Sequence, residues 1–117
     1  MSTVTTHVLD TSRGRPAPGV GVRLEPVTGD GVDPTRGPGG ASALAVASTD
    51  ADGRVADLGP DDLPAGRYRL VFATGEYFAG SGRETFYPRV TVEFEIGEPG
   101  QHYHVPLLVS PYGFTTY

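Results

Sequence analysis

The chain is patterned by short segments in which apolar and polar residues alternate. Residues 87–96 show this most clearly, because every second side chain from Val90 to Ile96 is apolar and the intervening ones are polar. A period of two residues is typical of a strand with one buried face. The same pattern recurs in shorter form in residues 3–10, 20–25, 54–58, 67–73 and 102–109, and residues 43–49 are weakly patterned but compatible with a strand. We therefore expect seven strands and a terminal stub.

Glycine and proline interrupt this pattern too often for long helices. The chain holds 17 glycines and 11 prolines, and both residue types favour turns. Residues 74–81 are the one helix candidate, with Thr74 as the N-cap and Gly80 or Gly82 at the end. Asp52-Gly53 predicts a tight turn.

A chain of 117 residues suits one domain. The many short strands predict an all-β sandwich of seven to eight strands with one short helix, in a single domain spanning residues 1–117. A long loop at residues 27–40 carries five glycines and two prolines, and we interpret it as a surface insertion without an assigned role.

The composition and the net charge exclude several kinds of site and partner. There is no cysteine, which excludes disulfides and thiolate metal ligands. The net charge is −5, and the nine basic residues are arginines scattered along the chain, which argues against nucleic acid as a partner. No apolar run approaches the length of a membrane span, and the first ten residues do not resemble a signal peptide. We expect a cytoplasmic protein that does not contact membranes.

Two of the three histidines lie in residues 102–109, on the face of the strand that does not belong to the core. Large and mostly apolar side chains occupy the odd-numbered positions, whereas the even-numbered positions hold His102, His104, Pro106 and Leu108. A face of this composition is more typical of one covered by another subunit or a ligand than of one exposed to water.

Two further outward-facing residues complete a candidate hydrolytic set. The inward position of Val8 turns His7 outward, and the inward position of Val55 turns Arg54 outward. A neutral imidazole can take a proton from water. A guanidinium can bind an anionic substrate or stabilise a developing oxyanion. The spacing of these residues along the chain does not by itself bring them together.

Each candidate also has a structural explanation. A single histidine in a strand is most often a polar surface residue. His102 and His104 have the spacing of zinc ligands, but His7 is the only other histidine and no carboxylate signature accompanies them, so we expect no metal. Ser110 precedes a proline without a nucleophile elbow around it, which favours a role in the turn.

Four motifs that span nearly the whole chain occur together in a known family. They are residues 7–14 (HVLDTSRG) followed by Pro16-Ala17, residues 49–54 (TDADGR), residues 77–78 with 86–88 (YF and FYP), and residues 102–113 (HYHVPLLVSPYG). With these motifs in this order, the chain resembles the transthyretin-like family, in its branch of 5-hydroxyisourate hydrolases. Several motifs in order are far more specific than any one of them.

The resemblance implies a transthyretin-like β-sandwich that hydrolyses 5-hydroxyisourate in urate degradation without a cofactor. By motif position, the catalytic residues of the family fall on His7, Arg54 and His104. Hormone-carrying transthyretins lack the two histidines and the arginine at these positions, which favours a hydrolase. The resemblance also implies a homotetramer of two sandwich dimers, with active sites in the channel between the dimers.

Within this hypothesis His104 activates the water, His7 orients it or carries the proton, and Arg54 binds the substrate and stabilises the oxyanion. Which histidine is the base stays open. The enzyme branch ends in Tyr-Arg-Gly-Ser, and this sequence stops at the first of the four, Tyr117, which we expect to bind substrate. If the other three residues are truly missing, activity should be impaired. The rival hypotheses are a carrier that binds a small aromatic ligand without chemistry, and a sandwich used only for protein contacts.

Overall fold

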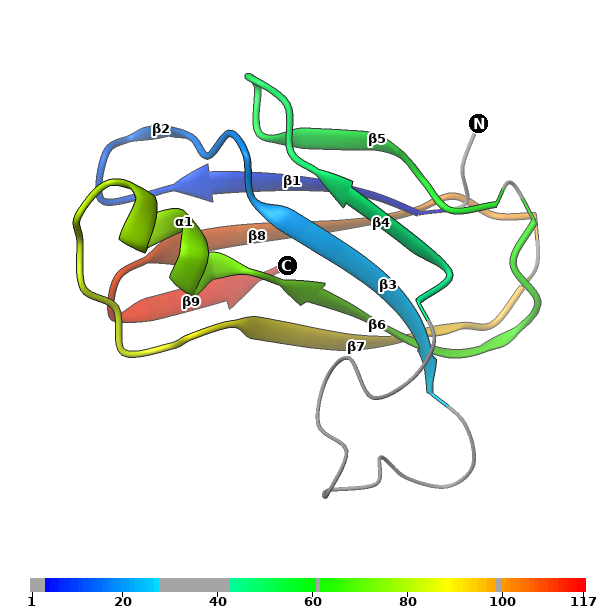
Figure 1. Cartoon of the computed structure of the whole chain (residues 1–117). Helices are drawn as coiled ribbons and strands as arrows, with labels where there is room; N and C mark the ends of the chain where they lie inside the picture. The colour runs from blue at the N-terminus through cyan, green and yellow to red at the C-terminus, as the bar shows by residue number, and fades with distance from the viewer. Residues whose placement is uncertain (1–3, 28–42, 61, 99) are drawn as a thin grey trace.

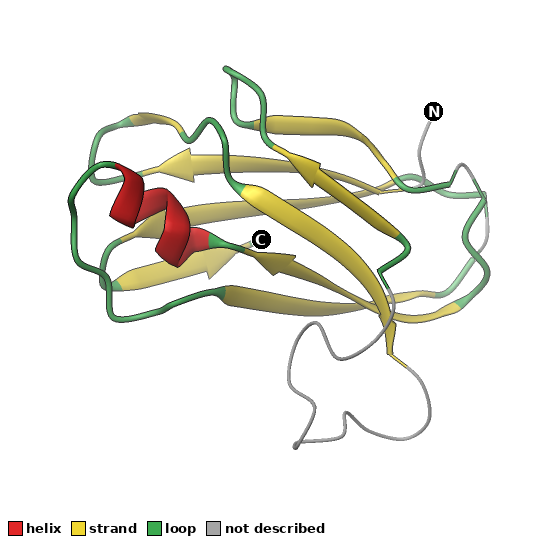
Figure 2. Ribbon diagram, in the orientation of Figure 1, coloured by secondary structure: helices red, strands yellow, loops and turns green. Residues whose placement is uncertain are grey.

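Two β-sheets pack face to face, and one short helix lies at one end of the sandwich (Figures 1 and 2). The computed structural model describes residues 4–27, 43–60, 62–98 and 100–117. In these residues the elements are β1 (Val4–Asp10), β2 (Arg15–Pro16), β3 (Gly21–Val27), β4 (Ala45–Ser48), β5 (Arg54–Leu58), β6 (Gly66–Phe72), α1 (Thr74–Gly80), β7 (Val90–Ile96), β8 (Tyr103–Ser110) and β9 (Gly113–Thr116). The predicted all-β sandwich with one short helix is confirmed.

Strand β1 is the centre of one sheet. Strand β8 pairs with it in parallel along its whole length, and β9 continues the sheet beyond β8. The other edge of β1 is shared, because β5 pairs with its first half and β2 with its last two residues. The second sheet is antiparallel throughout, in the order β4-β3-β6-β7. A parallel pair needs a long connection, and here the whole second sheet lies between β1 and β8 in the chain.

The core lies between the two sheets, where the predicted inward positions meet. In β1 the alternation is complete, with Val4, Thr6 and Val8 buried and the residues between them only half-buried. Burial of one large apolar side chain contributes roughly 1.5–3 kcal/mol. The completely buried apolar side chains of the sheets and helix include Val4, Val8, Val22, Leu24, Leu58, Leu70, Phe72, Phe78 and Leu107.

Strand β6 departs from simple alternation, because residues on both of its faces are buried. Arg69, on the side opposite Leu70, is 6% exposed. Its Nε donates a hydrogen bond to Oε1 of Glu25, the residue that faces it on β3, at 2.8 Å. Arg23 donates to the other carboxylate oxygen of Glu25 at 3.0 Å. Pairing with two guanidinium groups offsets the desolvation of this carboxylate.

Three boundaries differ from the sequence expectation. Residues 15–16, expected in a loop, form the short strand β2 against the end of β1. Strand β7 begins at Val90 and not at residue 87, because the carbonyl oxygen of Pro88 accepts a hydrogen bond from the Gly75 amide at 3.0 Å and holds this segment against the start of α1. The loop expected at residues 27–40 lies, apart from Val27 in β3, outside the described residues.

The prediction that Thr74 caps the helix was wrong. Thr74 is the first helical residue, Ala73 holds the cap position, and no side chain caps the helix. The cause is that Thr74 lies only two residues after the buried end of β6, so its side chain points into the protein and is 1% exposed. The predicted end is confirmed, since the helix stops at Gly80, and Phe78 anchors it in the core.

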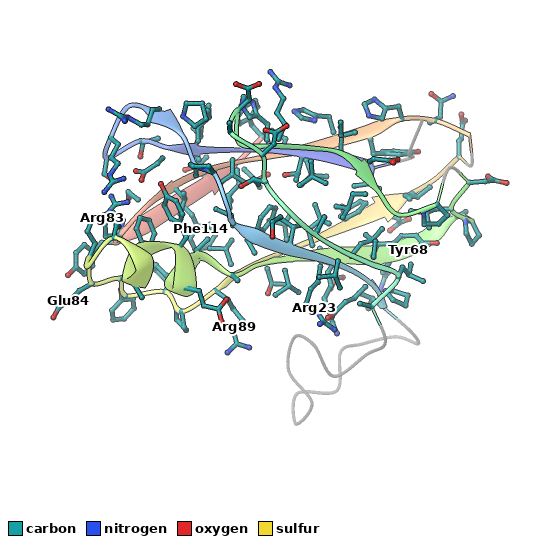
Figure 3. All side chains as sticks on the ribbon, turned by 45° about the horizontal axis from the view of Figure 1, so that its top comes forward. Arg23, Tyr68, Arg83, Glu84, Arg89 and Phe114 are labelled. Carbon is teal, nitrogen blue, oxygen red and sulfur yellow. The ribbon has the colours of Figure 1, made fainter. Side chains whose placement is uncertain are left out.

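A buried carboxylate joins the end of β1 to α1 and the segment after it. Asp10 is fully buried. Its Oδ2 accepts hydrogen bonds from the Tyr77 hydroxyl at 2.7 Å and from Nη2 of Arg83 at 2.9 Å, while the Ser12 amide donates to Oδ1 at 3.0 Å. Burial alone would raise the pKa of Asp10, but the hydrogen bonds from Ser12, Arg83 and Tyr77 and the charge of Arg83 lower it to about 2. Figure 3 shows Arg83 at the end of the sandwich that carries the helix, with Glu84 beside it.

Replacement of Asp10 by asparagine should therefore destabilise the protein at neutral pH. Because the folded pKa of about 2 lies below the ordinary 3.8, the carboxylate stabilises the fold above pH 4, and this stabilisation disappears as the pH falls through 2. The shift corresponds to roughly 2 kcal/mol. Urea unfolding at pH 7 and at pH 2.5 measures the difference between Asp10→Asn and wild type, which should shrink at the lower pH. Glu84→Gln, a change of the same kind on an exposed residue, should leave both unfolding curves in place. If Asp10→Asn lowered the free energy of unfolding equally at both pH values, the stabilisation would not come from the charged carboxylate.

Candidate functional site

The register of three neighbouring strands gathers the predicted residues on one face of the sheet (Figure 1). Strand β1 places His7 opposite Arg54 of β5, and it places Thr5 opposite His104 of β8. Directly paired residues project from the same face of a sheet. The inward neighbours Val8 and Val55 are buried, so His7, Arg54 and His104 all lie on the outer face, as the alternation predicted.

A depression of about 320 Å³ lies on this face between β1, β5 and the start of β8. Arg54, His102 and His104 contribute the groups able to act as acid, base or cation. The remaining lining residues are Thr5, Thr6, Val55 and Ala56. The depression is open to solvent along the sheet, and the side chains of Arg54 and His104 are exposed.

Two predicted residues lie outside the lining of this depression. His7 sits on the same face, half-buried, at the turn that precedes β5. Tyr117 follows the end of β9, is 76% exposed, and lies across the sheet from β5, with β8 and β1 between. Further along β8, Pro106 is buried and Leu108 half-buried, because β1 and β9 flank this part of the strand.

Sequence reasoning missed Thr5. Its Oγ1 lies 3.0 Å from Nε2 of His102 and 2.9 Å from Nδ1 of His104, so one hydroxyl joins the two imidazoles. The alternation of the strand did indicate where Thr5 points, since Thr5 lies two residues before His7 and therefore shares its face. What the sequence did not reveal is the parallel register that sets Thr5 opposite His104.

The turn before β5 fixes both His7 and Arg54. Oδ1 of Asp50 accepts hydrogen bonds from the amides of Asp52 at 2.9 Å and Arg54 at 3.0 Å. Gly53 has φ of +75°, and a Cβ at this position would lie 2.3 Å from the carbonyl oxygen of Val8. Only glycine fits there without displacing β1. The predicted tight turn is confirmed, and it holds Arg54 in register with His7.

The same turn assigns the tautomer of His7. Nε2 of His7 lies 3.0 Å from the carbonyl oxygen of Asp52. A carbonyl oxygen only accepts, so this nitrogen carries a hydrogen. In the neutral ring the lone pair is then on Nδ1, which is the atom of His7 able to accept a proton.

The electrostatics of the face keep His104 neutral. Partial burial lowers the pKa of His104 below the ordinary 6.5, and the nearby positive charges of His7, Arg54 and His102 lower it further. The pKa of the Asp50 carboxyl is also lowered, chiefly by the hydrogen bond from the Arg54 amide, and for a carboxyl this favours the charged form. At neutral pH the face therefore presents an uncharged His104 beside a permanently charged Arg54, a combination suited to proton abstraction from water next to an anion-stabilising group.

Within the described ranges, no group of three or more histidine, cysteine, aspartate or glutamate side chains is placed to hold a metal ion. In the same residues, no helix is both long and apolar enough to cross a membrane. Ser110 has the turn role expected for it, because its hydroxyl donates to the Gly113 carbonyl oxygen at 3.2 Å.

Known proteins resemble this chain in both sequence and fold. The model of the HIUase/Transthyretin family matches residues 4–117. The 5-hydroxyisourate hydrolase of Salmonella dublin is 44% identical over 112 residues, which cover 95% of this chain and 76% of that protein. The solved 5-hydroxyisourate hydrolase of Klebsiella pneumoniae has a TM-score of 0.80 and 41% identity, over 100% of this chain and 92% of that one. A sea bream transthyretin in complex with thyroxine has a TM-score of 0.84 and 30% identity, over 98% and 92% of the two chains.

The titration of His104 tests the electrostatics of this face. Its midpoint, followed by NMR of the ring protons, should lie below 6.5, and Arg54→Gln should raise it by removing a neighbouring positive charge. Arg67→Gln removes an exposed guanidinium at the start of β6, in the other sheet, and should leave the midpoint unchanged. A midpoint at or above 6.5, or one indifferent to Arg54→Gln, would show that His104 does not experience the charges assigned to it.

Proposed function

Because the chain belongs to the HIUase/transthyretin family, we propose that it is a hydrolase that opens the six-membered ring of 5-hydroxyisourate with water. The observation that carries the proposal is the pairing on one sheet face of an imidazole whose pKa is lowered, His104, with the guanidinium of Arg54. Relatives named as 5-hydroxyisourate hydrolases, at 40–44% identity, support the same activity. The product expected from this reaction is 2-oxo-4-hydroxy-4-carboxy-5-ureidoimidazoline, an intermediate of urate degradation.

In the proposed mechanism, water attacks a ring carbonyl carbon as Nε2 of His104 takes its proton. The oxygen of the carbonyl becomes negative in the tetrahedral intermediate, where Arg54 stabilises it. The C–N bond of the ring then breaks, and the leaving nitrogen receives a proton while the carbonyl carbon becomes a carboxylate. These steps use only side chains and water, so no cofactor enters the proposal.

His7 and Tyr117 have supporting roles in this mechanism. The ring of His7 is held by the Asp52 carbonyl through its Nε2 hydrogen. This contact favours His7 as the group that orients the water or passes on a proton through Nδ1, with His104 as the base. Tyr117 would bind substrate from an adjoining subunit, because within its own chain it stands apart from the depression.

We propose a homotetramer of cytoplasmic chains, because the face that carries the depression is open and, among the described residues, several edge strands pair on one side only. Strands β7 and β9 are each the last strand of a sheet, and exposed edges of this kind favour pairing with another chain. Phe114 of β9 packs edge-on against Tyr87, with ring centroids 5.2 Å apart. Phe114 nevertheless remains 45% exposed, and Phe86, which precedes Tyr87, is 71% exposed. Apolar surface of this kind is typical of an interface.

The second candidate function is that of a carrier. It is favoured by the fold alone, since the sea bream transthyretin in complex with thyroxine superimposes well on this chain. A carrier would bind a small aromatic ligand on the same face without chemistry. Acceleration of hydrolysis separates the two functions directly, because binding without turnover leaves the decay of 5-hydroxyisourate unchanged.

Replacement of the base or of the cation should abolish most activity. His104→Asn and Arg54→Ala are each expected to lower kcat/KM for 5-hydroxyisourate by at least about a hundredfold, since loss of a general base commonly costs about 10²–10⁴-fold. The measurement is the ultraviolet decay of freshly made 5-hydroxyisourate, with this chain and with the same chain extended by Arg-Gly-Ser. Arg67→Ala is the matched control for Arg54→Ala and should retain full activity. Wild-type rates in both site variants would refute the assignment of these residues.

Assembly is tested separately from chemistry. Light scattering should give the mass of four chains for wild type and a smaller mass for Phe114→Asp, because a charge in the aromatic cluster is costly to bury. Leu44→Asp changes a side chain of almost the same exposure, 44%, that precedes β4, and it should leave the mass unchanged. A wild-type monomer would contradict the homotetramer and favour a sandwich without an intersubunit site.

A further inference from the structure

The Thr5 hydroxyl stands between two imidazoles and has a single hydrogen to offer. Its Oγ1 is within hydrogen-bond distance of Nε2 of His102 and Nδ1 of His104. A hydroxyl donates once and can accept twice. When the hydroxyl hydrogen of Thr5 is used in one of these two contacts, Thr5 donates to one imidazole and accepts from the other. The tautomers of His102 and His104 are therefore coupled through this oxygen.

The coupling allows two neutral arrangements, and only one suits a base at Nε2 of His104. In the first, Thr5 donates to Nδ1 of His104 and accepts from Nε2 of His102, which leaves the hydrogen of His104 on Nε2. In the second, Nδ1 of His104 donates to Thr5, and Thr5 donates to Nε2 of His102. The lone pair of His104 is then on Nε2, where it can take a proton from water.

We propose that Thr5 is a positioning residue that relays the proton taken up by His104 to His102; this inference rests on the proposed hydrolysis. Water gives a proton to Nε2 of His104 as its oxygen bonds to the substrate carbonyl carbon. The hydrogen on Nδ1 of His104 passes to Oγ1 of Thr5, while the hydroxyl hydrogen of Thr5 passes to Nε2 of His102. His104 ends neutral, Thr5 keeps one hydrogen, and His102 becomes the imidazolium.

The charges around His104 favour transfer of the proton away from His104 and toward His102. The ionisable groups that face His104 are His7 of β1, Arg54 of β5 and His102 on its own segment, and each disfavours a positive charge on His104. His102 precedes the first residue of β8 and is exposed, so a proton that reaches it can pass to solvent. The Thr5 hydroxyl contacts His102 and His104, whereas Nε2 of His7 is engaged by the Asp52 carbonyl.

The decisive comparison is between Thr5→Val, which keeps the branched shape and removes the hydroxyl, and Thr5→Ser, which keeps the hydroxyl. Thr5→Val should lower kcat for 5-hydroxyisourate by about tenfold or more, a smaller loss than the roughly 10²–10⁴-fold expected for removal of the base itself, while KM changes by less than about twofold. Thr5→Ser should stay within about threefold of wild type in kcat. Thr91→Val, the same change on the exposed outer side of β7, should have no effect. Unfolding curves verify that all three variants are folded.

A double variant separates the relay from independent effects. The glutamine side chain of His102→Gln cannot take up the proton that His102 would receive, so this variant should also have a lower kcat. Because both residues would act through His104, Thr5→Val with His102→Gln should be no slower than the slower single variant. The relay would be overturned if the losses of kcat in the two single variants multiplied in the double variant. It would also be overturned if Thr5→Val and Thr5→Ser lost kcat equally, or if Thr5→Val were fully active.

An NMR experiment tests the coupling even where no hydrolysis is found, and so distinguishes failure of the relay from failure of the proposed function. With ¹⁵N-labelled histidine, the first protonation on lowering the pH should shift the ring nitrogens of His102 and His104 together in wild type and in Thr5→Ser. In Thr5→Val each ring should titrate with its own midpoint. Identical titrations in Thr5→Val and wild type would show that the hydroxyl does not couple the rings.

Discussion

The site depends on the position of one strand, β1, between β5 and β8. Its outward residues His7 and Thr5 stand opposite Arg54 and His104, while its inward residues Val4 and Val8 are fully buried in the core. A shift by one residue would exchange the two faces and bury the site residues. The apolar core therefore fixes the register, and the register fixes which polar groups meet.

The second half of β1 is held by contacts that only certain residues can make. Near the middle, the Val8 amide donates to the Gly53 carbonyl oxygen at 2.7 Å, in a turn where a Cβ would collide with Val8. At the far end, the buried Asp10 ties the strand to Tyr77 and Arg83. These two contacts anchor the strand directly after His7, and firm placement of this kind is what a preorganised site requires.

The outer face gathers positive and potentially positive groups around His104. His104 responds with a lowered pKa, and the hydroxyl of Thr5 gives it a neutral partner. An arrangement of this kind is unfavourable for holding a second proton and favourable for binding a substrate that becomes negative during the reaction. This asymmetry supports the proposed hydrolysis over the storage of a ligand without chemistry.

The sequence by itself determined the strands, the tight turn at Gly53 and the outward orientation of His7, Arg54 and His104, because a two-residue period and turn chemistry are local properties of the chain. It also carried motifs sufficient to indicate the family. Only the tertiary structure decided that Thr74 starts the helix without capping it, that Arg69 is buried against Glu25, and that Thr5 joins His102 to His104. Each of these depends on which strand lies beside which. Strands β1 and β8 are separated by most of the chain, and the parallel register between them is set by packing of the whole sandwich and not by any local pattern.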